Sequence, residues 1–271
     1  HSHGVKGYVA FNTLVFSAEM PDAEAQLRLL ERSGVDAVIV QDLGLAEMAK
    51  RVAPRLRLHA STQMTITSPE GLEFAKRLRI DQAVLSRELS LRELERFRAA
   101  EHPELPLEVF VHGALCVAYS GQCLTSESLG RRSANRGECA QACRMPYQMV
   151  VDGEVVDLGD KRYLLSPQDL AAVEEIPRLI ELGIRSFKIE GRLKTPEYVA
   201  AVTQVYRKAI DRALAEAEGD SKRPLISESD RYALEMTFSR GLYTGWMHGV
   251  NHQELVGARY GKKRGPFAGK V

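Results

Sequence analysis

The sequence has few cysteines, no long apolar run and no excess of charge of either sign. No segment approaches the roughly 20 consecutive apolar residues of a membrane-spanning helix, and no secretory signal pattern opens the chain. Lysine and arginine number 37 against 36 aspartate and glutamate, so the formal net charge of the 271 residues is +1. A nucleic-acid site would therefore have to be a local basic patch. These absences predict a cytoplasmic protein with no membrane partner.

Several catalytic motifs are also missing. The chain contains no H-E-x-x-H, no G-x-S-x-G, no P-loop and no C-x3-C-x2-C, and no glycine-rich dinucleotide fingerprint follows a predicted strand. The sequence therefore does not assemble a conventional protease, hydrolase or nucleotide-binding site.

Short β-rich runs alternate with longer helical patterns through most of the chain. The predicted strands are 7–12, 35–40, 56–59, 83–85, 107–111 and 185–189, and the predicted helices are 21–33, 45–52, 69–78, 91–100, 170–182 and 195–217. Such alternation predicts an α/β fold of parallel strands with crossover helices. Because a closed barrel needs eight strands, we expect a (β/α)8 TIM-type barrel that lacks its first two βα units in this chain. A doubly wound open sheet is the alternative.

The pattern also predicts where the barrel is interrupted and where it ends. We expect a partial barrel over 1–218, with a cysteine-rich loop at 113–147. A β-hairpin is expected at 147–165, before the last barrel strand, with Asp152 and Gly153 at its turn. Residues 219–271 are polar and glycine-rich and predict a tail leading toward a further β-rich domain.

All 4 cysteines lie in one segment, at Cys116, Cys123, Cys139 and Cys143. Such clustering in a large chain is typical of a metal or cluster site rather than of disulfide staples. Zinc ribbons carry C-x2-C pairs, which are absent here, whereas the wider gaps suit a loop around an iron–sulfur cluster. Zinc and four buried free thiols are the alternatives.

Polar residues follow the carboxyl end of each predicted strand, which is where the active face of a barrel forms. The anion-binding candidates among them are Arg87, Lys188 and Arg192, with Gln63 as a further substrate-binding residue. The acid–base candidates are His59, Glu88, His112 and Glu190.

Two basic groups have more than one interpretation. Arg131, Arg132, Arg136 and Arg144 lie in the cysteine segment, and they either balance the charge of the thiolates or contact phosphate. Lys262, Lys263 and Arg264 form a second basic run, which is more typical of a solvated loop.

Several blocks of sequence resemble the collagenase-like peptidase family, family U32. They are 108–123 and 133–147, which contain the cysteines, together with 186–192, 59–63 and 38–44. The block Ser133–Gly137 with Cys143–Tyr147 is most similar to the ribosomal-RNA cytidine hydroxylase branch of that family.

The resemblance implies a (β/α) barrel in which the four cysteines hold a 4Fe–4S cluster. It implies hydroxylation at C5 of a pyrimidine in ribosomal RNA or tRNA, with prephenate rather than dioxygen as the hydroxyl source. The expected partners are thus RNA and a small anionic co-substrate, and the open edges of an incomplete barrel allow pairing with a second copy. The alternatives are a collagenase-like peptidase and a non-catalytic, zinc-stabilised scaffold or partner subunit.

Overall fold

The computed structural model describes residues 2–100, 105–217, 224–265 and 269. The chain forms two compact units. The N-terminal unit comprises His1–Val109 and Ala118–Ala142, and the C-terminal unit comprises Phe110–Val117 and Cys143–Val271. The predicted boundary between residues 218 and 219 lies outside the described residues.

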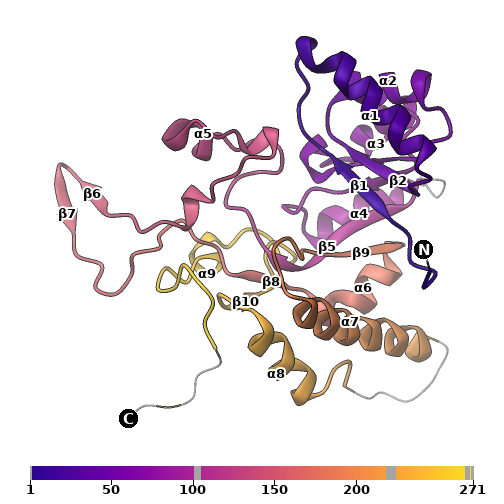
Figure 1. Cartoon of the computed structure of the whole chain (residues 1–271). Coiled ribbons are helices and arrows are strands. Elements are labelled where there is room, and N and C mark those ends of the chain that lie inside the picture. Colours follow the sequence, from indigo (N-terminus) through magenta and orange to yellow (C-terminus); the bar gives the residue numbers. More distant parts are fainter. Residues whose placement is uncertain (1, 101–104, 218–223, 266–268, 270–271) are drawn as a thin grey trace. The chain divides into compact units, whose positions relative to one another are not determined.

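The N-terminal unit is built on parallel strands, each followed by a helix (Figure 1). Its strands are β1 (Tyr8–Phe11), β2 (Ala37–Val40), β3 (Leu58–Ala60), β4 (Gln82–Val84) and the first residues of β5 (Leu107–Ala114). Its helices are α1 (Met20–Arg32), α2 (Leu43–Val52), α3 (Pro69–Arg77), α4 (Leu91–Ala99) and α5 (Thr125–Gly130). The strands pair in sequence order from β1 to β5, which confirms the predicted α/β fold with a mostly parallel sheet.

Local sequence explains these elements. The apolar residues of β2 are covered on both faces, so that Ala37, Val38 and Val40 are fully buried. Helix α4 begins at a capping box, in which Ser90 Oγ accepts from the Glu93 amide and the Glu93 carboxylate accepts from the Ser90 amide.

The C-terminal unit continues β5 with strands of mixed direction. Strand β8 (Asp169–Ala171) pairs antiparallel with β5, β10 (Leu242–Tyr243) pairs parallel with β8, and β9 (Ser186–Ile189) also pairs with β5. Its helices are α6 (Ile176–Glu181), α7 (Pro196–Ala217), α8 (Glu228–Thr237) and α9 (His252–Leu255). Short 3-10 helices elsewhere in the chain span Ser17–Glu19, Thr62–Met64, Ala134–Arg136, Ala142–Arg144 and Val173–Glu175.

The hairpin β6 (Met149–Val151) and β7 (Glu154–Val156) occupies the segment where a hairpin is predicted. Asp152 and Gly153, at its turn, both have positive φ, at 51° and 88°. This geometry is the one that favours an Asp-Gly pair in a two-residue connection.

The TIM-type barrel is not confirmed: no closed barrel is found among the described residues, and β8 runs antiparallel to β5, whereas the strands of a TIM barrel are parallel. One helix prediction is wrong. The helix predicted over 170–182 begins only at Ile176. Its first residues instead form β8, where pairing with His112–Ala114 overrides the local helical pattern.

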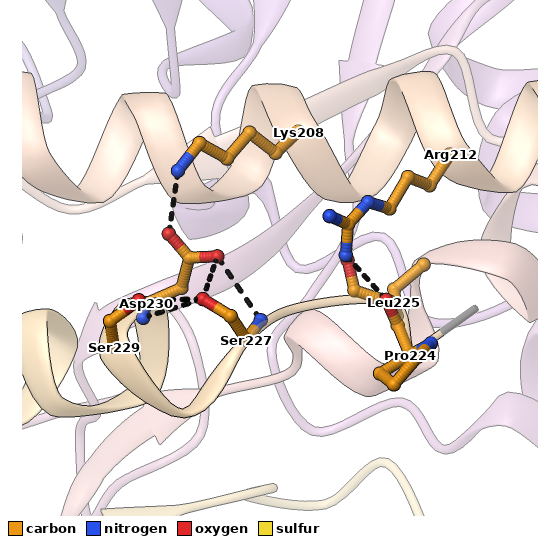
Figure 2. Close-up of polar contacts among 7 residues, drawn as sticks. All are labelled: Lys208, Arg212, Pro224, Leu225, Ser227, Ser229 and Asp230. Carbon is orange, nitrogen blue, oxygen red and sulfur yellow. Dashed lines mark hydrogen bonds and ion pairs between the residues drawn. The ribbon is translucent and has the colours of Figure 1, made fainter.

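Polar contacts fasten α8 to α7 (Figure 2). Asp230 accepts from Lys208 Nζ at 2.7 Å and from Ser227 Oγ at 2.7 Å, which combines an interhelical ion pair with a capping box. Arg212 of α7 donates to the carbonyl groups of Pro224 and Leu225, just before α8. Among the described residues no helix has the length and apolar character needed to cross a bilayer.

Candidate functional site

The predicted site residues divide between the two units. The N-terminal unit contains His59, Gln63, Arg87, Glu88, Cys123 and Cys139, and the C-terminal unit contains His112, Lys188, Glu190, Arg192, Cys116 and Cys143.

His59 and Gln63 follow β3 in the N-terminal unit. His59 is buried, and its ring meets the edge of Tyr8 at a centroid distance of 4.7 Å. Ser61, between them, accepts from Asn12 Nδ2 at 3.3 Å, so the ends of β1 and β3 are joined by side chains. The Gln63 Oε1 atom is buried without a hydrogen-bond partner. The loop after β3 therefore contains polar groups that are largely shielded from solvent.

Glu88 binds the start of the cysteine segment. Its Oε1 atom accepts from the Ser120 amide at 2.5 Å and from Ser120 Oγ at 2.9 Å. The Ser120 carbonyl accepts from Thr65 Oγ1 at 2.8 Å. Gly121 follows with a φ of +75°, and a Cβ there would collide with the Gln63 carbonyl oxygen. Sequence reasoning missed Ser120 and Thr65, since nothing in the linear pattern shows that loops 55 residues apart will meet.

Cys123 and Cys139 have polar neighbours within the N-terminal unit. The Gln141 amide lies 3.4 Å from Cys139 Sγ, and Ser126 Oγ lies 3.9 Å from the same atom. Asn135 donates to the Cys123 carbonyl at 3.4 Å. Both cysteines therefore lie among hydrogen-bonding groups of the loop that contains them.

Arg136 anchors the same segment. Its guanidinium contacts both carboxylate oxygens of Glu19, at 2.7 and 2.5 Å, and also donates to the Leu14 carbonyl at 2.9 Å. The hydrogen bond from Arg136 lowers the pKa of Glu19 from 4.5 to about 2. Arg136 is therefore engaged in a bidentate pair inside the protein.

Arg144 joins the chain around Cys116 to the chain around Cys143 in the C-terminal unit. It donates to the Leu115 carbonyl and to Ser166 Oγ, both at 2.8 Å, and to the Pro167 carbonyl. Burial, and to a lesser extent the charge of Arg240, lower its pKa to about 10, while Cys143, Asp169 and Cys116 act in the opposite direction. The positive charge of Arg144 thus lies close to two of the predicted cluster ligands.

The strand-end residues of β5 and β9 meet in the C-terminal unit. The Glu190 amide donates to the His112 carbonyl at 2.9 Å, and the Glu190 Oε1 atom accepts from the Arg192 amide at 2.9 Å. Lys188 Nζ lies over the ring of Phe110 at 5.4 Å. This arrangement brings His112, Glu190 and Arg192 to neighbouring positions.

His112 is a buried, neutral imidazole. It is 1% exposed, and burial lowers its pKa to about 4, with the charge of Asp169 opposing this shift. Its Nδ1 atom lies 3.3 Å from the hydroxyl of Tyr206, which itself donates to the Val111 carbonyl. The Tyr206 hydroxyl can therefore only accept from His112, which assigns the proton to Nδ1.

All four cysteines are free thiols; Cys116, Cys123 and Cys143 are partly buried and Cys139 is exposed. In the part of the chain that the structure describes, no three His, Cys, Asp or Glu side chains gather closely enough to hold a metal ion. The donor set nevertheless has the chemistry that an iron–sulfur cluster requires, namely four reduced sulfurs.

Comparisons with known proteins find one family along nearly the whole chain. The family model for peptidase family U32 matches residues 1–257. The chain is 41% identical to the 23S rRNA 5-hydroxycytidine C2501 synthase of Escherichia coli, over 89% of this chain and 36% of that protein. It is 36% identical to tRNA hydroxylation protein P1 of Bacillus subtilis, over 96% of this chain and 62% of that protein. It is also 32% identical to a collagenase of Porphyromonas gingivalis, over 95% of this chain and 63% of that protein. The chain thus spans between about a third and two thirds of these relatives.

Proposed function

Because the chain belongs to peptidase family U32, as its motifs predicted, we propose that it is an RNA-modifying hydroxylase. The observation that carries the proposal is the similarity to two proteins named for hydroxylation of ribosomal RNA and of tRNA, over 89% and 96% of this chain. The more specific form of the proposal is hydroxylation at C5 of a cytidine in ribosomal RNA, in the cytoplasm. Prephenate would serve as co-substrate and hydroxyl source, without dioxygen.

The four cysteines are the proposed ligands of a 4Fe–4S cluster. Support comes from their spacing in the sequence and from their free thiols. When bound, the cluster would carry electrons. The Gln141 amide lies 3.4 Å from Cys139 Sγ, and the Arg144 guanidinium donates to the Leu115 carbonyl beside Cys116, so both cysteines have positive or donor groups nearby.

The other residues of the proposed site act in binding, proton transfer and positioning. Arg87, Lys188 and Arg192 are proposed to bind the anionic co-substrate, with Gln63 as a further contact. His59, His112 and Glu190 are the proposed acid–base residues. Glu88 is proposed to act through Ser120, because its carboxylate already accepts the hydrogen bonds that fix the start of the cysteine segment.

The test is RNA hydroxylation by the anaerobically purified chain, loaded with iron and sulfide and quantified for both. Ribosomal RNA that lacks the modification is incubated with and without prephenate, and its nucleosides are analysed by mass spectrometry. We expect hydroxycytidine only when cluster and prephenate are both present, and we expect Cys139→Ser to lower cluster content and product together. Unchanged cluster content in Cys139→Ser would show that the ligand set is wrong.

A peptidase activity is the competing outcome, since one relative is named a collagenase. Cluster-free chain that cleaves gelatin, together with loaded chain that yields no hydroxylated pyrimidine, would replace the hydroxylase by a peptidase. Stoichiometric zinc without sulfide would instead indicate a zinc-stabilised protein.

A further inference from the structure

The C-terminal unit contains a cavity of about 580 Å³ that none of the predicted site residues lines. Its size falls within the range of roughly 300–1,000 Å³ typical of small-molecule sites. The side chains that matter for its chemistry are Lys161, Gln168, Arg240, Arg259, Tyr260 and Arg264. These come from the segment before β8, the start of β10 and the residues after α9.

The lining carries four cationic side chains and no carboxylate. Two of the cations have acidic partners outside the lining, since Arg240 pairs with Asp169 at 2.5 Å and Arg259 pairs with Asp160 at 3.2 Å. Lys161 and Arg264 have no carboxylate partner among the residues that the structure describes. The cavity wall therefore has an excess of positive charge, which favours an anionic ligand.

Arg240 supplies a buried donor. Its side chain is 8% exposed, and its Nε atom is buried without a hydrogen-bond partner. A buried donor without a partner is unfavourable, and a hydrogen bond from it to an anion in the cavity would remove that penalty.

Gly241 lies where the side chains of Gln168 and Arg264, both in the cavity wall, approach the backbone closely. Gly241 has a φ of +105°, and a Cβ there would collide with Gln168 Oε1 and lie 3.0 Å from Arg264 Nη2. Gln168 is fixed by donating to the Glu254 carbonyl at 2.8 Å. Any larger residue would thus displace both Gln168 and the Arg264 guanidinium.

The exposure of the side chains around the cavity favours a polymer over a small, fully enclosed ligand. Arg259, Arg264 and Lys161 are all exposed, so a chain of phosphates can pass over them. Tyr260 is 49% exposed beside them, and the Arg264 guanidinium lies over its ring at 5.2 Å from the centroid. Basic side chains interleaved with an exposed aromatic ring are typical of single-stranded nucleic-acid binding.

We propose that this cavity binds a phosphate group of the RNA substrate, with Arg264, Lys161 and Arg240 as its cationic ligands and Tyr260 beside an adjacent base. The inference rests on the proposed RNA hydroxylase function and adds a substrate-binding site to it. Guanidinium groups suit this task because they present paired N–H donors to phosphate oxygens.

The experiment measures binding of a fluorescently labelled single-stranded RNA of 12 or so nucleotides to the full chain by anisotropy, across a series of salt concentrations. The test variant is Lys161→Gln with Arg264→Gln. The matched control is Lys263→Gln, which removes one charge beside Arg264 but does not line the cavity. Thermal melting of all three proteins verifies that they are folded.

We expect the double variant to bind RNA at least about tenfold more weakly and to lower the salt-dependence slope by about 1–2. The control should stay within about twofold of the unchanged chain. Equal RNA affinities of the double variant and the control would overturn the cavity proposal alone. If the protein without substitutions binds no RNA, the proposed function is overturned, and the cavity proposal with it.

A titration with adenosine 5′-monophosphate tests whether the phosphate group that binds in the cavity belongs to a free small molecule rather than to RNA. If the mononucleotide binds, if that binding is lost in the double variant, and if RNA affinity is unaffected, the cavity serves a free phosphorylated molecule. That result would overturn the assignment to RNA.

Discussion

Replacement of Arg144 tests whether one guanidinium group holds the segments around Cys116 and Cys143 in place. The perturbation is Arg144→Met, which keeps most of the side-chain volume but removes all donors. The three acceptors left behind are the Leu115 carbonyl, the Pro167 carbonyl and Ser166 Oγ. Arg131→Met is the matched control, because Arg131 is an exposed arginine of the same cysteine-rich segment.

The magnitude follows from these three contacts. A hydrogen bond from a charged donor contributes about 1.5–3 kcal/mol, and a buried acceptor without a donor costs about 1–3 kcal/mol. The cost of burying the guanidinium, which is visible in its lowered pKa of about 10, offsets part of this stabilisation. We therefore expect Arg144→Met to lower the free energy of unfolding by about 3 kcal/mol, which is a large fraction of the roughly 5–15 kcal/mol of a typical protein.

Urea unfolding of the cluster-free chain, followed by circular dichroism, measures this loss. Iron bound per chain after anaerobic loading measures whether Cys116 and Cys143 stay in place. We expect Arg131→Met to change stability by no more than about 0.5 kcal/mol, and Arg144→Lys to recover only part of the loss because lysine lacks the guanidinium fork. Equal stability and equal iron content in Arg144→Met and Arg131→Met would refute the reasoning.

Three further predictions concern single residues. Gly121→Ala should lower the free energy of unfolding by about 2–4 kcal/mol in urea, because its φ is +75° and the new Cβ would strike the Gln63 carbonyl oxygen; an unchanged midpoint would show that this loop is free to move. The pKa of His112 falls from 6.5 to about 4 on folding, so only the unfolded chain takes up a proton between these values. The contribution of His112 to the free energy of unfolding should therefore be fully present above pH 6.5 and fall by about 3 kcal/mol as the pH falls to 4. In His112→Gln, the free energy of unfolding should not show this fall over the same pH range. Asp230→Ala should cost about 1–2 kcal/mol through loss of the cap and of the contact with Lys208; thermal melting indistinguishable from that of the unchanged chain would contradict this estimate.

The first half of the fold was predictable because its signals are local. Buried apolar runs such as 35–40 fix the strands, and caps such as Ser68 and Ser90 fix where helices begin. Strand β8 was not predictable in this way. Leu170 lies in an apolar pattern that fits a helix, and its pairing with Gly113 of β5 and Tyr243 of β10 makes it part of a sheet. Non-local pairing leaves no periodic trace in a three-residue strand.

The contacts of the candidate site could not be predicted from the sequence. Strand-end position proposed Glu88 and Glu190 as site residues, which stays a prediction, and it did not show that Glu88 accepts hydrogen bonds from Ser120. The basic run ending at Arg264 was interpreted as a solvated loop, and its three side chains are exposed. Arg264 also lines a cavity together with Arg240, because its amide donates to the Ser239 carbonyl just before β10.

The arginines of the cysteine segment had two equally favoured roles, charge balance and phosphate contact. Both Arg136 and Arg144 donate to protein acceptors in their own unit. Arg136 donates to Glu19 and to the Leu14 carbonyl, and Arg144 donates to the backbone beside Cys116. Charge balance and phosphate contact stay predictions. Together with the Glu88–Ser120 contact, these bonds use no cysteine sulfur as donor or acceptor. We therefore expect them to hold the segment at fixed points near its cysteines, so that the ordering cost of binding a cluster would fall on the remaining loop rather than on the whole segment.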